Sequence, residues 1–190
     1  MIPKAIKRWT VDQYLDLAEK GFLRKAPHVE LIDGVIYDKA VSGHRHMFAF
    51  NRLDGFFREN MGHVASIFVR GTVRLGTYDG LEPDIAVFRG SYENYRCREP
   101  LASELIWVVE IIDAPLDDFQ DKAPVSARFG IPEFWLVDVK GRRVLVHRSP
   151  SPESETWGEV LEVGEAGSIA PLGQTESVRV AEILPAPDVP

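Results

Sequence analysis

The sequence of 190 residues contains one cysteine and no long apolar run. A single thiol, that of Cys97, forms no intrachain disulfide and supplies no cluster of thiolate metal ligands. A membrane-spanning helix needs roughly 20 predominantly apolar residues, and no segment approaches this length. Residues 1–9 also lack the apolar core of a secretory signal peptide. We therefore expect a cytoplasmic protein with no membrane partner.

An excess of basic residues is also missing. The chain has 22 Lys and Arg against 29 Asp and Glu, which gives a formal net charge of −7 at pH 7. Proteins that grip DNA non-specifically usually carry a positive surface, so this balance counts against a simple nucleic-acid binder. The negative charge does not exclude a nuclease, because catalytic carboxylates add negative charge to the site itself and a local basic face can coexist with an acidic protein.

Apolar residues make up 45% of the chain, which is enough for one substantial core. We expect a single domain over residues 1–190, with a core at about residues 10–185 and a frayed tail at 186–190. Periodicity and turn signals predict a mixture of helices and strands. The predicted helices cover residues 11–21, 42–61 and 122–129; the predicted strands cover a hairpin at 29–37 and the runs 64–75, 85–88, 105–112, 134–138, 144–147, 160–163 and 178–184, with a loop at 149–152.

Two local signals are specific. Thr10 and Gln13 have the spacing of a capping box that opens a helix. Asp33-Gly34 between two β-type runs predicts a tight hairpin, because glycine accepts a positive φ. Glu30 then lies on the first arm of that hairpin.

Two carboxylates interrupt otherwise apolar segments. Asp84 precedes the run Ile-Ala-Val-Phe, and Glu110 lies within residues 105–112 (LIWVVEII). A carboxylate in such a strand loses hydration, and the cost is tolerated mainly where a cation or a hydrogen-bond donor compensates. The pair therefore suggests a divalent-metal site. Structural ion pairs with Arg70 or Arg74 are the alternative explanation.

The donor types match a hard cation. Mg²⁺ prefers oxygen ligands and is typically held by one or two carboxylates together with waters and phosphate oxygens. If the two strands are neighbours, Asp84, Glu110 and the backbone carbonyl of Ile111 can share one ion at a sheet end. The ion would neutralise a scissile phosphate and lower the pKa of a bound water.

A lysine near that water would orient it and stabilise charge that develops in the transition state. Lys122 is the candidate, because it begins the predicted helix that follows the Glu110 strand. Lys39 and Lys140 lie in turn or strand-end positions with no clear reason to face the carboxylates. A plain ion pair between Lys122 and Asp118 at helical spacing is the alternative.

Other polar or aromatic residues have simpler explanations. Glu30 beside an Asp-Gly turn is commonly a solvated hairpin residue. His44 and His46 splay to different faces of a helix start, which favours capping or packing, with the active cleft as an alternative place for His46. Trp107 and Trp135 belong to β-type runs and are core candidates rather than platforms for base stacking.

The order of several motifs resembles a known family. The motifs are residues 29–34 (VELIDG), His46 at a helix start, Pro83-Asp84, residues 108–111 (VVEI), Asp118 with Lys122, and residues 130–138 (GIPEFWLVD). Together they resemble the Uma-type "putative restriction endonucleases" of the PD-(D/E)XK nuclease superfamily. The resemblance spans roughly residues 10–185, and the last motif is its most recognisable part.

This resemblance implies an α/β (α+β) fold of the restriction-endonuclease type, with a mixed central β-sheet flanked by helices. It implies a Mg²⁺-dependent endonuclease acting on DNA, with Mn²⁺ as a possible substitute, and a homodimer, because cutting both strands of a duplex needs two sites. Asp84 and Glu110 match the metal ligands, and Glu30 matches an early acidic position that can hold a metal-bound water or a second ion. The superfamily's usual lysine position is Ile112 here, and Lys122 on the next helix takes its place.

Some positions depart from the family pattern. Residues 113–115 (DAP) replace a turn that usually contains Ser-Pro, and Ser126 stands where tyrosine is usual. Pro124 is compatible with a helix only if the helix starts close to Asp121, because proline deeper inside removes a backbone bond and clashes. A catalytically weak or inactive binding or assembly module, and hydrolysis of another phosphate ester, are therefore the alternative functions.

Overall fold

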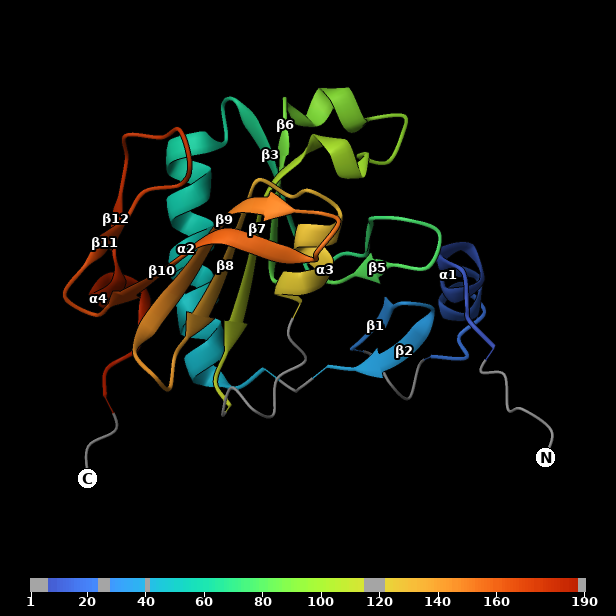
Figure 1. Cartoon of the computed structure of the whole chain (residues 1–190), viewed down its shortest axis with the longest axis horizontal. Helices are drawn as coiled ribbons and strands as arrows, with labels where there is room; N and C mark the ends of the chain where they lie inside the picture. The colour runs from blue at the N-terminus through green and yellow to red at the C-terminus, as the bar shows by residue number, and fades with distance from the viewer. Residues whose placement is uncertain (1–6, 24–27, 40–41, 115–121, 188–190) are drawn as a thin grey trace. The chain divides into compact units, whose positions relative to one another are not determined.

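The computed structural model describes residues 7–23, 28–39, 42–114 and 122–187 (Figure 1). The chain divides into two compact units: the first comprises Met1–Val41 and Gly71–Glu82, and the second comprises Ser42–Arg70 and Pro83–Pro190. The single domain over residues 1–190 stays a prediction. Of the expected frayed tail, residues 188–190 lie outside the described residues. No helix within the described ranges is long and apolar enough to cross a membrane.

The first unit combines one helix with a small antiparallel sheet. Its elements are α1 (Val11–Glu19), β1 (Val29–Ile32), β2 (Val35–Asp38), β4 (Val73–Arg74) and β5 (Gly80–Leu81), and the strand order is β2-β1-β5-β4. The predicted capping box of α1 is confirmed, since the Gln13 amide donates to Thr10 Oγ1 at 3.3 Å and the Thr10 amide donates to Gln13 Oε1 at 3.2 Å. The predicted hairpin is also confirmed. Asp33 and Gly34 have φ values of 51° and 75°, as a two-residue turn of type I′ requires.

The second unit is built on a six-stranded mixed sheet with the order β10-β9-β8-β7-β6-β3. Its elements are α2 (His44–Met61), β3 (Ala65–Val69), β6 (Ile85–Arg89), two short 3₁₀ turns (Tyr92–Tyr95 and Ala102–Glu104), β7 (Leu105–Ile112), α3 (Ala123–Arg128), β8 (Glu133–Asp138), β9 (Arg143–Ser151), β10 (Thr156–Gly164), β11 (Ser168–Ile169), β12 (Val178–Arg179) and α4 (Val180–Ile183). In the six-stranded sheet β7 and β8 pair in parallel, and the other neighbours pair antiparallel. The expected mixed sheet flanked by helices is therefore present.

The two faces of this sheet carry different side chains. Val109 and Ile111 on β7 belong to the same buried cluster as the inner residues of α2. The ring of Phe57 on α2 lies 6.2 Å from Trp107 and 5.7 Å from Trp135, which confirms both tryptophans as core residues. Because side chains alternate along a strand, Glu110 points to the opposite face. Helix α3 lies on that face and contacts β9 and β10 (Figure 1).

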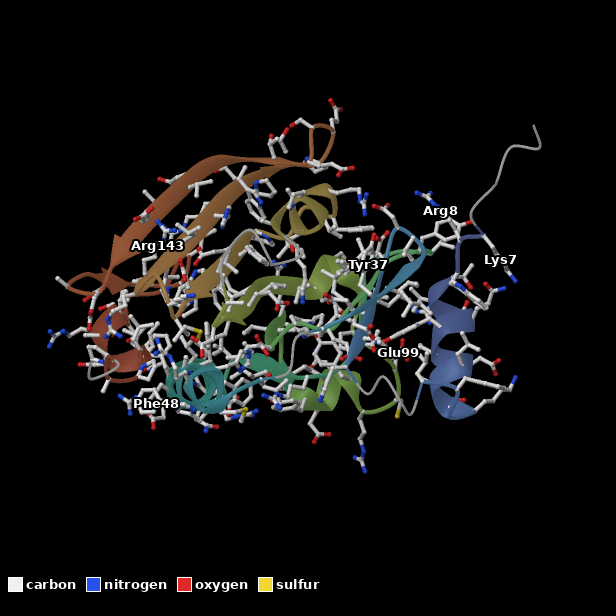
Figure 2. The ribbon with its side chains drawn as sticks, turned by 90° about the horizontal axis from the view of Figure 1, so that it is seen from below. Lys7, Arg8, Tyr37, Phe48, Glu99 and Arg143 are labelled. Atoms are coloured by element: carbon white, nitrogen blue, oxygen red, sulfur yellow. The ribbon has the colours of Figure 1, made fainter. Side chains whose placement is uncertain are left out.

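Helix α2 is amphipathic, with its apolar face against the sheet. Its inner residues Ala49, Leu53 and Phe57 are fully buried. Figure 2 shows Phe48 on the side of α2 away from the sheet, where the ring is 44% exposed. The first turn of α2 and the carboxyl end of β7 lie at the same end of the sheet (Figure 1), and Arg45 Nε on that turn is 3.2 Å from Asp113 Oδ1 just after β7.

The β-rich run 64–75 holds two strands, β3 and β4, because the φ of 52° at Arg70 ends the first ladder. Two other expectations about individual elements were wrong. The expected strand over 178–184 continues only to Arg179 and then becomes α4, since Val180 and Ile183 are buried at a spacing that suits a helical turn. The expected loop at 149–152 is largely strand. Pro150 is tolerated in β9 because β9 pairs with β8 only as far as Arg148. Beyond Arg148 the strand pairs with β10 alone, so Pro150 lies in an edge segment.

Candidate active site at the end of the central sheet

The Asp84 and Glu110 carboxylates lie together at one end of the sheet. Ile85 is opposite Val109 in the antiparallel pair of β6 and β7, so Asp84, one residue before Ile85, is opposite Glu110. Residues directly opposite each other share one face of a sheet. Both side chains are buried, with 5% of Asp84 and 2% of Glu110 exposed. Two desolvated acids at one point need compensating donors or a cation.

Asp84 receives two hydrogen bonds at the same oxygen. Its Oδ2 accepts from the Ile111 amide at 2.9 Å and lies 3.0 Å from Nε2 of His46. An ionised carboxylate only accepts hydrogen bonds, so Nε2 of His46 carries the proton in this contact. In an antiparallel ladder the amide and the carbonyl of one residue point to the same neighbouring strand. The Ile111 carbonyl therefore lies along the edge of β7 that faces Asp84.

Glu110 is paired with Lys122. The Lys122 Nζ donates to Glu110 Oε1 at 2.6 Å, and both side chains are only 2% exposed. Lys122 is the residue that precedes α3, and Pro124 is the second residue of that helix, where its missing amide has no intrahelical partner. The alternative partner, Asp118, lies outside the described residues. Removing one partner of such a buried pair leaves an uncompensated charge and costs about 3–5 kcal/mol.

His46 is the site residue that sequence reasoning underestimated. It is 7% exposed, and its Nδ1 has no hydrogen-bond partner among the residues that the structure describes. The sequence favoured capping or packing for both histidines, but only His44 is exposed, whereas His46 contacts Asp84. The signal was its spacing. His46 precedes Ala49 and Phe50 by three and four residues, so it lies on the inner face of α2.

Glu30 lies in the first unit, so it is described apart from the other candidates. Its side chain is 2% exposed, which contradicts the alternative of a solvated hairpin residue. Its Oε2 accepts a hydrogen bond from the Glu82 amide at 3.3 Å. Because Asp84, Glu110 and Lys122 belong to the second unit, a shared site with Glu30 stays a prediction.

Glu82 is a second acid with an altered environment in the first unit. Burial raises the pKa of its carboxyl, while the Lys39 ammonium acts in the opposite direction. Its Oε1 accepts from Thr72 Oγ1 at 3.3 Å and lies 3.5 Å from the Tyr14 hydroxyl. Burial also raises the pKa of Tyr14, and the neighbouring Glu82 adds to that shift.

The arginines considered as structural partners for the two acids lie elsewhere. The guanidinium of Arg70 lies over the Phe50 ring at 5.0 Å and contacts the Met47 sulfur. Arg74 pairs with Asp12 at 2.7 Å within the first unit. The donors beside the acids include Lys122, His46 and the Ile111 amide.

The donor set at this sheet end suits a hard divalent cation. Two carboxylates and a backbone carbonyl are all oxygen ligands, which Mg²⁺ and Mn²⁺ accept and softer metals do not prefer. Over the described part of the chain, no group of three or more His, Cys, Asp or Glu side chains is placed to hold a metal ion. Asp84, Glu110 and Ile111 offer only the protein oxygens of the common Mg²⁺ arrangement, in which waters and substrate oxygens complete the shell.

Comparison with known proteins identifies a family and a fold. A sequence model of the Uma2 family, described as "Putative restriction endonuclease", matches residues 11–178. A crystal structure of a protein from Anabaena variabilis ATCC 29413, described as "a putative nuclease belonging to DUF820", superposes with a TM-score of 0.67. The two chains are 18% identical, and the match covers 92% of this chain and 96% of the other, which shows a common fold of the restriction-endonuclease type. No curated protein matches this chain.

Proposed function

This chain belongs to the Uma2 family of "putative restriction endonucleases", and from that membership we propose that it is a metal-dependent endonuclease that hydrolyses DNA phosphodiester bonds. One observation carries the proposal: two buried carboxylates lie opposite each other at one sheet end, with a buried lysine 2.6 Å from the second. Nucleases need such a cluster because a phosphodiester carries negative charge that grows during hydrolysis.

Asp84, Glu110 and the Ile111 carbonyl are the proposed ligands of Mg²⁺, with Mn²⁺ as a substitute. When bound, such an ion neutralises charge on the scissile phosphate and lowers the pKa of a coordinated water. The protein's own contribution is to fix the ligands before the ion arrives. The Ile111 amide and His46 Nε2 hold Asp84 Oδ2 at 2.9 and 3.0 Å, so this carboxylate loses little freedom on binding.

Lys122 has two roles in this proposal. Its ammonium keeps Glu110 ionised and oriented through the 2.6 Å contact. An ammonium has three donors, so a second N–H can point to the attacking water or to a phosphate oxygen while the Glu110 bond persists. Charge that develops on the phosphate is then met by a cation already in place, without reorganisation of solvent.

Glu30 is the fourth proposed member, with the support of the family resemblance and of its burial at 2% exposure. Its proposed task is to hold a water or a second ion. A homodimer acting on duplex DNA in the cytoplasm completes the proposal, since two strands require two sites. The Glu30→Gln variant tests this role separately, because the substitution keeps an acceptor for the Glu82 amide while it removes the charge.

The test is incubation of the purified protein with supercoiled and single-stranded DNA in the presence of Mg²⁺ or Mn²⁺. Wild-type protein is expected to nick or linearise DNA, and Glu110→Gln and Asp84→Asn are expected to lose about 10²-fold or more of the rate. Glu159→Gln on the exposed face of β10 makes the same change of charge and is the matched control. Thermal melting of each variant separates loss of chemistry from loss of fold.

Metal binding gives a second readout. Calorimetric titration of wild-type protein should show Mn²⁺ binding, and the Glu110→Gln variant should bind Mn²⁺ with lower affinity. DNA cleavage by Glu110→Gln at the wild-type rate would reveal a contaminating nuclease and contradict the assignment. Absence of both cleavage and metal binding would favour the inactive binding or assembly module, and metal-dependent turnover of other phosphate esters with intact DNA would favour a different phosphoesterase.

A further inference from the structure

Arg70 lies at the same end of the sheet as the proposed active site. It directly follows β3, whose last paired residue, Val69, is opposite Ile85 on β6. Arg70 therefore comes one residue after this pair, and Asp84 comes one residue before it on the neighbouring strand. The two residues occupy adjacent positions across the strand pair, and Glu110 occupies the next position on β7.

The backbone conformation of Arg70 places its side chain on the face of the sheet opposite to the one that strand alternation would give. On β3, Ile67 and Val69 belong to the core beneath α2, whereas the ring of Phe68 lies on the other face, 5.2 Å from Phe88. Regular alternation would place Arg70 with Phe68. Its left-handed φ of 52° breaks the alternation, and the guanidinium instead lies against Phe50 of α2. Non-glycine residues in this conformation are strained, and such strain is concentrated at binding and active sites.

The charge of Arg70 has no acidic partner within the part of the chain that the structure describes. Among residues 7–23, 28–39, 42–114 and 122–187, no carboxylate forms an ion pair with it, and its contacts are the Met47 sulfur and the Phe50 ring. Other arginines of this unit, such as Arg58, Arg98 and Arg148, are each paired with an acid. Arg70 is also exposed. Stacking on an aromatic face orients a guanidinium and leaves donors at its edge for an anion.

We propose that Arg70 binds a phosphate group of the DNA strand that flanks the scissile phosphate, on the β3 side of the active site. This inference rests on the proposed nuclease function and specifies how the substrate is held there. The planar fork of a guanidinium matches two oxygens of one phosphate, which makes arginine the suitable residue for such a contact. It also gives a chain of net charge −7 a cation at the same end of the sheet as its two acids.

The experiment measures DNA binding in the absence of cleavage. Fluorescence anisotropy of a labelled duplex is recorded with Glu110→Gln as the background, in a series of salt concentrations. Adding Arg70→Gln is expected to weaken binding about 10-fold and to reduce the slope of log K against log salt by about 1, because one phosphate contact is lost. Arg70→Lys keeps the charge and should retain the slope while losing part of the affinity.

Arg89→Gln is the matched control. Arg89 is exposed, lies at the other end of β6 opposite Ala65, and gives the same change of charge. It should change the affinity less than about 2-fold and leave the slope unaltered. Arg70→Gly is the complementary variant. Glycine accepts the left-handed backbone, so this variant should melt at a higher temperature than the background and still bind DNA as weakly as Arg70→Gln.

The outcomes separate this inference from the proposed function. Equal effects of Arg70→Gln and Arg89→Gln would overturn the phosphate contact, even if wild-type protein cleaves DNA. Failure of the background protein to bind DNA at low salt would overturn it as well. Arg70-dependent binding by a protein that cleaves nothing would support the contact and remove the nuclease assignment. A melting temperature that falls in Arg70→Gly would indicate a structural role and count against the inference.

Discussion

Asp84 is held by two hydrogen-bond donors, the His46 ring and the Ile111 amide. The His46 contact at 3.0 Å and the Ile111 amide at 2.9 Å converge on Oδ2. A carboxylate fixed in this way is pre-organised for a cation, since the donors replace the water it lost on burial. We therefore propose that His46 acts through Asp84 as a positioning residue.

Substitution of His46 tests this role. His46→Leu removes the donor and should weaken Mn²⁺ binding about 10–100-fold, as is typical when a group that orients a metal ligand is lost. His46→Gln places an amide donor near the position of Nε2 and should recover part of the affinity. Calorimetry with Mn²⁺ measures both variants, and His44→Gln on the exposed side of the same turn is the control. Equal affinities of the Leu and Gln variants would argue against the hydrogen bond.

Lys122 is the residue whose loss should be most visible in stability. Lys122→Met leaves Glu110 charged and buried without its cation, so the free energy of unfolding should fall by about 3–5 kcal/mol. Lys122→Met combined with Glu110→Gln removes the charge of both partners and should recover much of this loss. Urea unfolding measures each variant. Lys20→Met, which breaks the exposed pair with Asp16, should cost less than about 0.5 kcal/mol.

Glu82 gives the first unit a dependence on pH. Because burial raises its pKa in the folded protein, the folded state holds the proton more tightly than the unfolded chain. The free energy of unfolding therefore decreases as the pH rises from the ordinary value of 4.5 through the raised pKa, and it is constant above that point. Glu82→Gln should flatten this decrease. Urea unfolding from about pH 4 to about pH 8 measures it, with exposed Glu19→Gln as the control.

At the scale of elements, most of the architecture followed from local patterns. The strand predicted over 105–112 is β7, and the helix predicted over 42–61 differs from α2 only in its first two residues. Both segments have long, unambiguous periodicity. The run 178–184 failed because four or five apolar residues fit a strand and a short helix equally well. Only burial against the rest of the unit decides between them.

The same contrast applies to the site. Asp84 and Glu110 were evident because a charge within an apolar strand is costly wherever the strand lies. His46 was not evident, since a histidine on the inner face of a helix is commonly a packing residue. Arg70 had no signal at all, because a left-handed backbone at arginine depends on the tertiary contacts with Phe50 and Met47. The two acids and Lys122 were predictable from the sequence, but the positions of His46 and Arg70 were not.

Two glycines offer a paired test of how α2 and α3 are built. Gly130 closes α3 with a φ of 66°, so Gly130→Ala should lower the free energy of unfolding by about 1 kcal/mol. Among the described residues, a Cβ there meets only Pro152 at 3.9 Å, so the cost is conformational rather than steric. Gly55 lies within α2 with open space beside it, and Gly55→Ala should raise stability by about 0.5–1 kcal/mol. Changes of the same sign would contradict this account.

At the scale of the whole molecule, the proposed function requires an acidic chain to hold a polyanion. A net charge of −7 opposes DNA at long range, so the proposal makes binding depend on local cations and on metal at the sheet end. DNA binding should therefore be weak in chelator and should strengthen when Mg²⁺ is added.

The proposed dimer also belongs to this scale. Light scattering after size-exclusion chromatography should give about twice the chain mass of 21.4 kDa. The measurement is made at several protein concentrations and with Mg²⁺ and duplex DNA present. A mass that stays at one chain under all of these conditions would contradict the dimer, while nicking of single strands would remain compatible with a monomeric enzyme.

The crossover from β7 to β8 has a consequence for how such sites change in evolution. Glu110 is fixed by the strand register, but Lys122 approaches it from the residue before the crossover helix, and Ile112 fills the strand position two residues after Glu110. Insertions or deletions in the connection can alter the number of residues between acid and lysine without moving either charge. A pattern search that demands a constant spacing would overlook such chains, whereas a comparison of side-chain positions in space would find them.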